Sequence, residues 1–252
     1  MTRHGANTSA SFQRLTHPPE PSTLVLQVDD PTKYGVVVHD ADGRIRQFVE
    51  KPKTFVGDHI NAGMYIFSPS VLDLIPNAVP MSLEKEVFPV LASAGSLFAM
   101  QLPGYWMDIG QPRDYITGTS LHLASLRLRA PERLAPSGPG IRGDVLIHPT
   151  ATVGAGALIG PGVVIGAGCR VGEGARISRA TLLEGVTIGA HACISNAIIG
   201  WSSSVGKWAR VEGGTVMGED VQLADETSLN GVLVLPHKSV RESIYTPGAI
   251  VM

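Results

Sequence analysis

An aliphatic residue returns at about every sixth position through most of the second half of the chain. A helix would repeat its apolar stripe every three or four residues, and a half-buried strand every two, so neither element explains this spacing. A period of six is typical of a parallel β-helix with triangular coils, in which each short side turns one aliphatic residue inward. The sixteen positions expected to line this core, with two one-residue slips of phase, are Ile147, Val153, Ile159, Ile165, Val171, Ile177, Leu183, Ile188, Ile194, Ile199, Val205, Val211, Met217, Leu223, Leu229 and Leu235.

Glycine is concentrated in the same half, where 18 of the 29 glycines lie between 138 and 218. Several directly follow the repeated aliphatic residue, as in Val153-Gly154 and Ile165-Gly166. Glycine suits a tight corner because it adopts positive φ without a Cβ penalty. The pattern therefore predicts about five stacked coils of a left-handed parallel β-helix of hexapeptide repeats with a continuous apolar core.

The first half alternates between strand-like runs and turns, which predicts an α/β domain. In its last helix Ile116, Leu123 and Leu126 should face inward. Ser82 should cap a shorter helix that begins with acidic residues. The expected strands are 34–39, 44–49, 60–67 and 99–103, and the expected last helix is 115–129.

Four regions follow from these patterns. Residues 1–23 are rich in Ser, Thr, Pro, His and Arg and are expected to form a disordered tail, with an organelle-targeting segment as the alternative. Residues 24–130 form the α/β domain. Residues 131–140 contain three prolines and two glycines and are expected to be a linker. Residues 141–252 form the β-helix.

The composition narrows the classes of function. The chain has 252 residues and a formal net charge of −2, and no basic block, which argues against nucleic acid as a partner. No apolar run approaches the roughly 18–20 residues of a membrane span, so no membrane partner is expected. The two cysteines, Cys169 and Cys193, fit neither a disulfide framework nor a metal cluster. A reducing compartment, most simply the cytoplasm, is therefore expected.

Three short motifs in the first half combine charged or amide groups with turn residues. The segment 48–52 ends a strand with an acid, a base and a proline. The segment 61–65 opens a strand with an amide and a glycine that allows close approach of a ligand. The segment 106–112 places one carboxylate among apolar neighbours, next to a turn. Taken singly, the three motifs fit a surface ion pair, a strand-end cap and a helix-leading aspartate, respectively. Together, in this order and ahead of hexapeptide repeats, they favour a functional site.

In combination these features resemble the sugar-1-phosphate nucleotidyltransferases, and within them the β-type GDP-mannose pyrophosphorylases (mannose-1-phosphate guanylyltransferases). The resemblance extends from about residue 28 to the C-terminus. It rests on VDDP at 28–31, YGVVV at 34–38, FVEKP at 48–52, INAGMYIF at 60–67, EKEVFP at 84–89, WMDIGQP at 106–112, SGPG at 137–140, GW at 200–201, NG at 230–231 and VLPHKS at 234–239. It implies a partial Rossmann-like nucleotidyltransferase domain, its sugar-phosphate side, followed by the β-helix.

The resemblance also implies which residues bind the sugar. Glu50 would bind sugar hydroxyls, and Asn61, Gly63 and the backbone at Gly35 would contact the sugar ring. The implied substrates are mannose-1-phosphate and GTP, which give GDP-mannose and pyrophosphate for glycan precursor synthesis.

Lys51 and Asp108 would be the catalytic residues that the resemblance implies. Lys51 would neutralise the sugar phosphate as it attacks the α-phosphate of GTP, and Asp108 would hold the cofactor Mg²⁺ with a second aspartate. Both reactants are anions, so a cation and a metal are needed while charge builds on the phosphoryl oxygens. The family's glycine-rich loop for nucleotide phosphates, G-x-G-T-R-L-x-P-L-T, does not occur in residues 1–23. The chain alone is therefore expected to be weakly active or inactive.

Other classes of function remain open. A non-catalytic regulatory or assembly subunit would keep the β-helix for contacts, and because terminal coils need capping, a homo-oligomer or a complex with a full-length paralogue is expected. A hexapeptide acyltransferase with His191 as its base would explain the repeat but neither the segment 48–52 nor the segment 106–112. Adenylyl- and thymidylyl-transferring relatives, and translation-factor subunits built on the same two domains, also fit the architecture.

Overall fold

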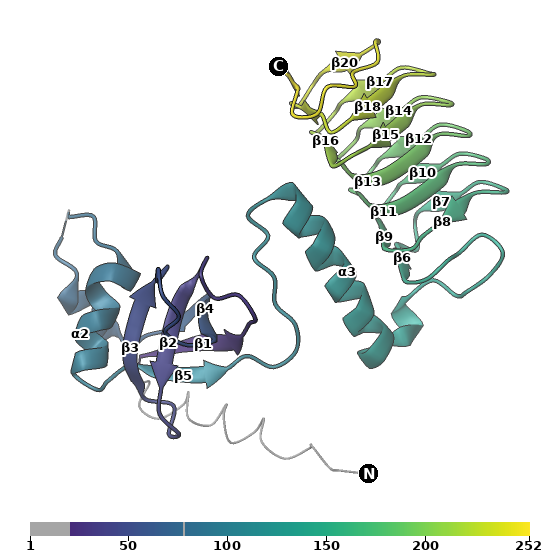
Figure 1. The fold of residues 1–252 in the computed structure, drawn as a ribbon. Helices are drawn as coiled ribbons and strands as arrows, with labels where there is room; N and C mark the ends of the chain where they lie inside the picture. Colours follow the sequence, from purple (N-terminus) through teal and green to yellow (C-terminus); the bar gives the residue numbers. More distant parts are fainter. Residues whose placement is uncertain (1–20, 78) are drawn as a thin grey trace. The chain divides into compact units, whose positions relative to one another are not determined.

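The structure is a computed structural model that describes residues 21–77 and 79–252. The chain forms two compact units, the first ending at Gly104 and the second spanning Tyr105–Met252. Figure 1 shows the elements of each unit in chain order. No helix in the described part of the chain has the length and apolarity needed to cross a bilayer.

The first unit is built on a mixed five-stranded sheet with the strand order β3-β2-β4-β1-β5. Strand β1 pairs antiparallel with β4 and parallel with β5, while β2 pairs antiparallel with both β3 and β4. The four strands expected from the sequence are all present. Strand β1 begins at Ser22, inside the expected tail, and residues 1–20 of that tail lie outside the described residues. The strands are β1 (Ser22–Gln27), β2 (Gly35–His39), β3 (Ile45–Glu50), β4 (His59–Ile66) and β5 (Phe98–Gln101).

Short helices lie between β4 and β5 in the first unit, namely η2 (Pro69–Leu74), η3 (Leu83–Val87) and α2 (Phe88–Ser93). Ser82 caps η3 as expected, because its hydroxyl accepts a hydrogen bond from the Lys85 amide at 3.2 Å. The turn that it caps is π-helical, and an α-helix follows only from Phe88. The fully buried Phe88 ring packs edge-on against Phe48 and Tyr65, so this helical segment covers the sheet face that those two residues share.

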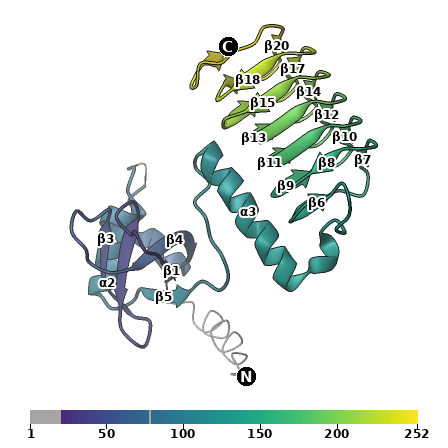
Figure 2. The same cartoon turned by 45° about the vertical axis from the view of Figure 1, so that its right-hand side comes forward.

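The second unit is a parallel β-solenoid preceded by helix α3 (Pro112–Arg129) and a short 3₁₀ turn, η4 (Pro131–Arg133). Six strands, one per coil, form one face in the order β20-β17-β14-β12-β10-β7. Strands β11 and β13 are long enough to run across the other two faces, where all pairings are again parallel. This stacking agrees with the predicted left-handed β-helix, and Figure 2 shows the coils edge-on.

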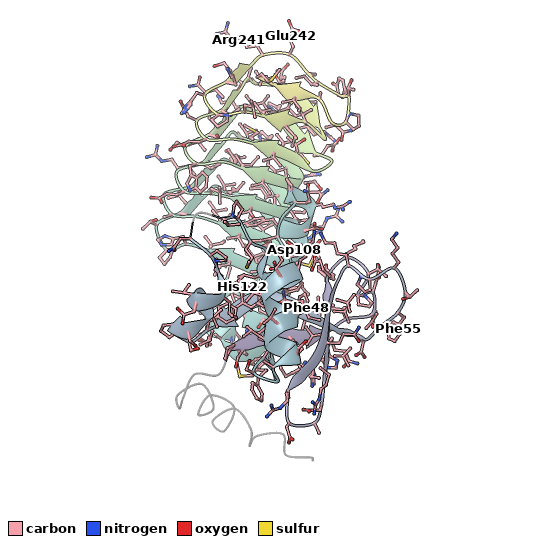
Figure 3. The ribbon with its side chains drawn as sticks, turned by 90° about the vertical axis from the view of Figure 1, so that its left-hand side faces the viewer. Phe48, Phe55, Asp108, His122, Arg241 and Glu242 are labelled. Carbon is pink, nitrogen blue, oxygen red and sulfur yellow. The ribbon has the colours of Figure 1, made fainter. Side chains whose placement is uncertain are left out.

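The solenoid strands are short because each coil turns three corners. They are β6 (Val145–Ile147), β7 (Thr152–Val153), β8 (Leu158–Ile159), β9 (Val163–Ile165), β10 (Arg170–Val171), β11 (Arg176–Leu182), β12 (Thr187–Ile188), β13 (Cys193–Ile199), β14 (Ser204–Val205), β15 (Arg210–Glu212), β16 (Thr215–Met217), β17 (Gln222–Leu223), β18 (Ser228–Asn230), β19 (Leu233–Val234), β20 (Ser239–Val240) and β21 (Ile250–Val251). Arg241 and Glu242 lie at the far end of the solenoid, just after β20 (Figure 3).

Twelve of the sixteen predicted core positions are buried, from Ile159 to Leu229, and they form the aliphatic core. Two of the predictions are wrong by one residue: Leu182 and Val234 are buried, while Leu183 is half-buried and Leu235 is 44% exposed. In both places the inward residue follows the preceding core residue by five positions, at 177 to 182 and at 229 to 234, whereas the prediction assumed six. At the first coil Ile147 is half-buried and Val153 is 41% exposed, because no coil lies beneath them.

A second buried column of small side chains runs beside the aliphatic column, two residues before each of its members. The column includes Ala157, Val163, Cys169, Ala175, Ala180, Val186, Ala192, Ala197, Ser203, Ala209, Thr215, Val221, Thr227 and Val232. Its hydroxyls satisfy backbone groups: the Ser203 hydroxyl donates to the Gly218 carbonyl at 2.8 Å and accepts from the Val221 amide at 2.9 Å. Cys169 is a buried member of this column, as its small size predicts, and Cys193 is half-buried.

Helix α3 packs on the outer surface of strands β9, β11 and β13 (Figures 1 and 2). Its buried side chains are Ile116, Leu123 and Leu126, which confirms the predicted inward face. Thr181, on the outer surface of β11, is only 3% exposed. This packing places the boundary of the compact unit at Tyr105, ahead of α3, whereas the boundary expected from the sequence lies after it, at 130.

Candidate functional site

Three strands of the first unit place a carboxylate, a glycine and an amide in one row. Gly35 on β2 is paired with Glu50 on β3, and the neighbouring pair Val36–Ile60 sets Asn61 of β4 opposite Gly35 on the other side. Residues directly opposite each other on antiparallel strands share a face of the sheet. Glu50 and Asn61 therefore flank a position that has no side chain.

Glycine is required at position 35 for a steric reason. A Cβ at Gly35 would lie 2.7 Å from Cζ of Phe48 and 2.9 Å from Oε2 of Glu50, both closer than real Cβ contacts. Any larger residue would displace the Glu50 carboxylate or the Phe48 ring. The row thus offers a hydrogen-bond acceptor and a hydrogen-bond donor on either side of a buried glycine, a pair of groups that suits a polyol.

The Asn61 amide is held by hydrogen bonds on both of its polar atoms. Its Oδ1 accepts from the Gly63 amide at 3.0 Å and from the Thr23 hydroxyl at 2.9 Å. Its Nδ2 donates to the Tyr65 hydroxyl at 2.6 Å, and that hydroxyl donates to Oε1 of Glu84 at 3.2 Å. Gly63 has a φ of +74°, and a Cβ there would meet nothing within 4 Å, so its backbone conformation rather than lack of space requires glycine.

Tyr65 should ionise only at high pH. Burial, and then the negative charge of Glu84, raise the pKa of Tyr65, although the hydrogen bond from Asn61 opposes the rise. Because the folded-state pKa exceeds the unfolded value near 10, stability that is complete below pH ~10 is lost as the pH rises through the folded-state pKa. We expect Tyr65→Phe to lose less stability than the wild type between about pH 9 and 11, as measured by urea denaturation.

A second tyrosine provides an internal comparison for the ionisation of Tyr65. The hydrogen bond with Ser243 lowers the pKa of Tyr245 in the solenoid. Ultraviolet titration should therefore show Tyr245 ionising before Tyr65, and the transition that disappears in Tyr65→Phe identifies Tyr65. If Tyr65→Phe keeps the full alkaline loss of stability, the Tyr65 contacts do not cause that loss.

Lys51 sits in a strained backbone conformation at the end of β3. Its φ is +46°, in the left-handed region, and Pro52 follows, although a residue before proline favours extended backbone. Its side chain is 67% exposed, with Nζ 3.8 Å from Oε1 of Glu50. Eight other described non-glycine residues have a positive φ, but all of them lie in the solenoid, between Arg179 and His237. Lys51 is the one such residue described in the first unit, and strain outside a repeated corner fits the ligand role expected for it.

Asp108 belongs to the second unit, in the segment before α3 (Figure 3). Its Oδ1 accepts a hydrogen bond from the Gly110 amide at 3.0 Å, which fixes the carboxylate at the turn, and the residue is exposed. Among residues 21–77 and 79–252, no group of three or more His, Cys, Asp or Glu side chains is arranged to hold a metal ion. One exposed carboxylate still fits Mg²⁺, which takes one or two carboxylates and fills its remaining positions with water and phosphate.

His191, the base of the alternative acyltransferase hypothesis, forms part of a corner of the solenoid. Its φ is +60°, and its ring stacks on Trp208 in the next coil, with centroids 4.3 Å apart and planes inclined by 24°. On the other side, a Cβ at Gly174 would come within 2.3 Å of Nδ1 of His191. The imidazole is thus packed between neighbouring corners, which gives it a structural role.

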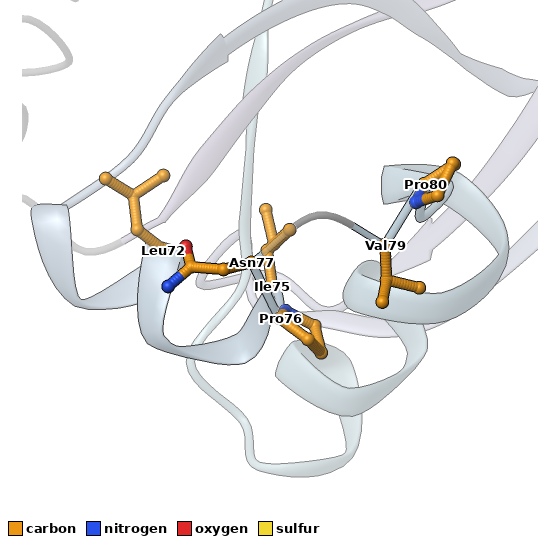
Figure 4. Close-up of a pocket in the computed structure, with 6 residues that line it drawn as sticks. All are labelled: Leu72, Ile75, Pro76, Asn77, Val79 and Pro80. Atoms are coloured by element: carbon orange, nitrogen blue, oxygen red, sulfur yellow. The ribbon is translucent and has the colours of Figure 1, made fainter.

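A pocket of about 630 Å³ lies elsewhere in the first unit, along η2 and the segment that follows it (Figure 4). Its lining consists of Leu72, Ile75, Pro76, Asn77, Val79 and Pro80. These side chains are apolar apart from one amide. The pocket therefore lacks the charged groups that a sugar phosphate requires, and it contains none of the expected site residues.

The structure thus brings together Gly35, Glu50, Asn61 and Gly63, with Lys51 next to Glu50. Sequence reasoning missed Tyr65 and Glu84 as members of this site. Tyr65 could have been found from its spacing, because it lies four residues after Asn61 on one strand and so shares its face. Glu84 lies in the EKEVFP segment that supports the family resemblance, but nothing in the sequence shows that it reaches Tyr65.

A nucleotidyltransferase-type sheet domain followed by a parallel hexapeptide solenoid defines the class of the protein. A nucleotidyl transferase family model matches residues 9–125, and a model of the GMPPB C-terminal domain matches residues 141–250. The chain is 55% identical over 233 residues to mannose-1-phosphate guanylyltransferase 1 of Arabidopsis thaliana, covering 92% of this chain and 64% of that protein. It is 53% identical over 235 residues to mannose-1-phosphate guanylyltransferase catalytic subunit beta of Danio rerio, covering 93% and 65%.

The chain therefore belongs to the mannose-1-phosphate guanylyltransferase family of nucleotidyltransferases. It spans just under two thirds of the length of these relatives. Both the predicted family and the predicted architecture, a nucleotidyltransferase domain followed by a β-helix, are confirmed.

Proposed function

We propose that this chain is the sugar-phosphate-binding portion of a mannose-1-phosphate guanylyltransferase, an enzyme that forms GDP-mannose and pyrophosphate from GTP and mannose-1-phosphate. The observation that supports it best is the row of Glu50, Gly35 and Asn61, with Lys51 beside it. The relatives' names state the same activity for those proteins. The compartment that we propose is the cytoplasm.

The residues of the row, with Lys51, contact different parts of the substrate. The Glu50 carboxylate accepts hydrogen bonds from sugar hydroxyls, and the Asn61 amide donates to a ring substituent. The Lys51 ammonium reaches the phosphate as a flexible point charge. A phosphate oxygen then attacks the α-phosphorus of GTP, so that one O–P bond forms while the bond to the β-phosphate oxygen breaks and pyrophosphate leaves.

Mg²⁺ is the cofactor that we propose, with Asp108 as its ligand from this chain. A bound divalent cation would screen the phosphate charges of the two anionic reactants. The Gly110 amide holds Oδ1 of Asp108, so the second carboxylate oxygen is available to a ligand at an exposed turn.

The activity is tested by pyrophosphate release. Any pyrophosphate that the chain releases, even at a low rate, should require GTP, mannose-1-phosphate and Mg²⁺ together, and Asp108→Asn should reduce that rate at least about 100-fold because it removes the metal-binding charge. Asp73→Asn, a matched change of an exposed aspartate in η2, should leave the rate unchanged. Equal rates in wild type and Asp108→Asn would remove Asp108 from the mechanism.

A second candidate function starts from the word subunit in the name of one relative, catalytic subunit beta, which describes a catalytic member of a complex. In this alternative the chain is a non-catalytic regulatory or assembly subunit, in a homo-oligomer or with a full-length paralogue, and the solenoid supplies the contacts. Isothermal titration calorimetry distinguishes the two functions. Binding of mannose-1-phosphate without pyrophosphate release, together with co-purification of a full-length partner, supports the subunit.

A further inference from the structure

The hydrogen-bond chain behind Asn61 has a fixed direction. The backbone N–H of Gly63 can only donate, so the Asn61 atom that faces it must be the oxygen, and Nδ2 must face Tyr65. The Tyr65 hydroxyl then accepts from Asn61 and has its own hydrogen free to donate to the Glu84 carboxylate. Glu84 is in turn held by the Ser82 hydroxyl, which donates to its Oε2 at 3.2 Å.

This chain leaves one hydrogen of the Asn61 amide for a ligand. Oδ1 is used by two donors and Nδ2 by one acceptor, so within the described residues the second Nδ2 hydrogen has no partner. Without the Tyr65 hydroxyl, Nδ2 would lose its acceptor and the amide could turn toward other partners. Asn61, Tyr65 and Glu84 are all half-buried, where hydrogen bonds are stronger than in water and less exchanged with solvent.

We infer that Tyr65, held by Glu84, is a positioning residue that presents the Asn61 amide as a hydrogen-bond donor to the sugar. The identity of the ligand, mannose-1-phosphate, rests on the proposed function, whereas the geometry of the inference does not depend on it. The aromatic ring is anchored independently of the hydroxyl, because it stacks on Phe67 with centroids 5.6 Å apart and meets Phe88 edge-on. Tyr65→Phe therefore removes the hydrogen bonds with Asn61 and Glu84 and retains the packing of the ring.

The geometry is tested without any ligand, through the side-chain amide of Asn61 in nitrogen-15 NMR, assigned by its absence in Asn61→Asp. In Tyr65→Phe and in Glu84→Ala we expect faster exchange of the amide hydrogens and a lower heteronuclear NOE than in the wild type. Glu84→Gln should retain most of the wild-type order, because its amide oxygen still accepts from Tyr65. An Asn61 amide that is as ordered in Tyr65→Phe as in the wild type overturns the inference.

The ligand role is tested by a double-mutant cycle on the dissociation constant for mannose-1-phosphate. We expect Asn61→Ala to weaken binding about 10-fold and Tyr65→Phe about 3- to 10-fold, and the double variant to bind no worse than Asn61→Ala alone. A merely structural effect of Tyr65 would instead multiply with that of Asn61, and such additivity overturns the inference. Tyr245→Phe, the matched change in the solenoid, should leave both readouts unchanged.

The two proposals fail in different ways. If the wild-type chain does not bind mannose-1-phosphate, the proposed function is contradicted, while the NMR signal of Asn61 still decides whether Tyr65 positions the amide. If the chain binds the sugar phosphate and the cycle is additive, the proposed function stands and the positioning role is wrong.

Discussion

Leu182→Ala should lower the free energy of unfolding of the second unit by about 2–5 kcal/mol, whereas Leu183→Ala should lower it by less than about 1 kcal/mol. Leu182 is fully buried, and its neighbours in the adjacent coils are Ile165 and Ile199, which are also buried. Truncation there leaves a cavity that stacked coils cannot close. Leu183 is half-buried, so its truncation removes less apolar surface from the core.

Tryptophan fluorescence during guanidinium denaturation is the appropriate measurement, because Trp106, Trp201 and Trp208 all belong to the second unit. The pair Val234→Ala and Leu235→Ala repeats the comparison at the other position where the prediction was wrong by one residue. The buried Val234 should again be the costlier site of the two, although its smaller side chain makes the difference smaller. Equal losses at Leu182 and Leu183 would contradict the inward assignment of Leu182.

The sequence predicted the period of the solenoid but not the exact phase at these two places. Leu182-Leu183 and Val234-Leu235 are pairs of adjacent aliphatic residues, so hydrophobicity does not distinguish which member faces inward. Stacking decides it, because the residue in register with the buried residues of the neighbouring coils must occupy the core. Where only one aliphatic residue was available, as at Ile177 or Ile188, the prediction is confirmed.

The same difference between local pattern and long-range packing explains which parts of the candidate site could be predicted. The segments 48–52 and 61–65 were recognisable because their residue types and order are local. That Gly35 separates Glu50 from Asn61 follows from the pairing of three strands, which a single sequence does not show. The contact between Tyr65 and Glu84 joins residues 19 positions apart and depends on how the Ser82 cap places the π-helical turn. Polar networks of this kind are fixed by tertiary packing, so local patterns cannot predict them.

Replacing Lys51 should separate binding from stability, because its charge acts on the ligand and its backbone conformation acts on the fold. Lys51→Ala and Lys51→Gly should both weaken binding of mannose-1-phosphate about 10- to 100-fold, since each removes a charge-assisted contact to the phosphate. The two variants should differ in stability. At a φ of +46° alanine retains the left-handed strain, worth about 1–2 kcal/mol, whereas glycine removes it at a smaller entropic cost.

The expected result is that Lys51→Gly is about 1 kcal/mol more stable than Lys51→Ala, as measured by calorimetric unfolding of the chain. Lys53→Ala, a change of a nearby exposed lysine, is the control for charge and should alter binding by less than about 2-fold. If Lys51→Gly binds as the wild type does, Lys51 does not contact the phosphate. If instead Lys51→Gly and Lys51→Ala are equally stable, the backbone at Lys51 is not strained. The conformation before Pro52 then costs no stability, and no ligand role is needed to explain it.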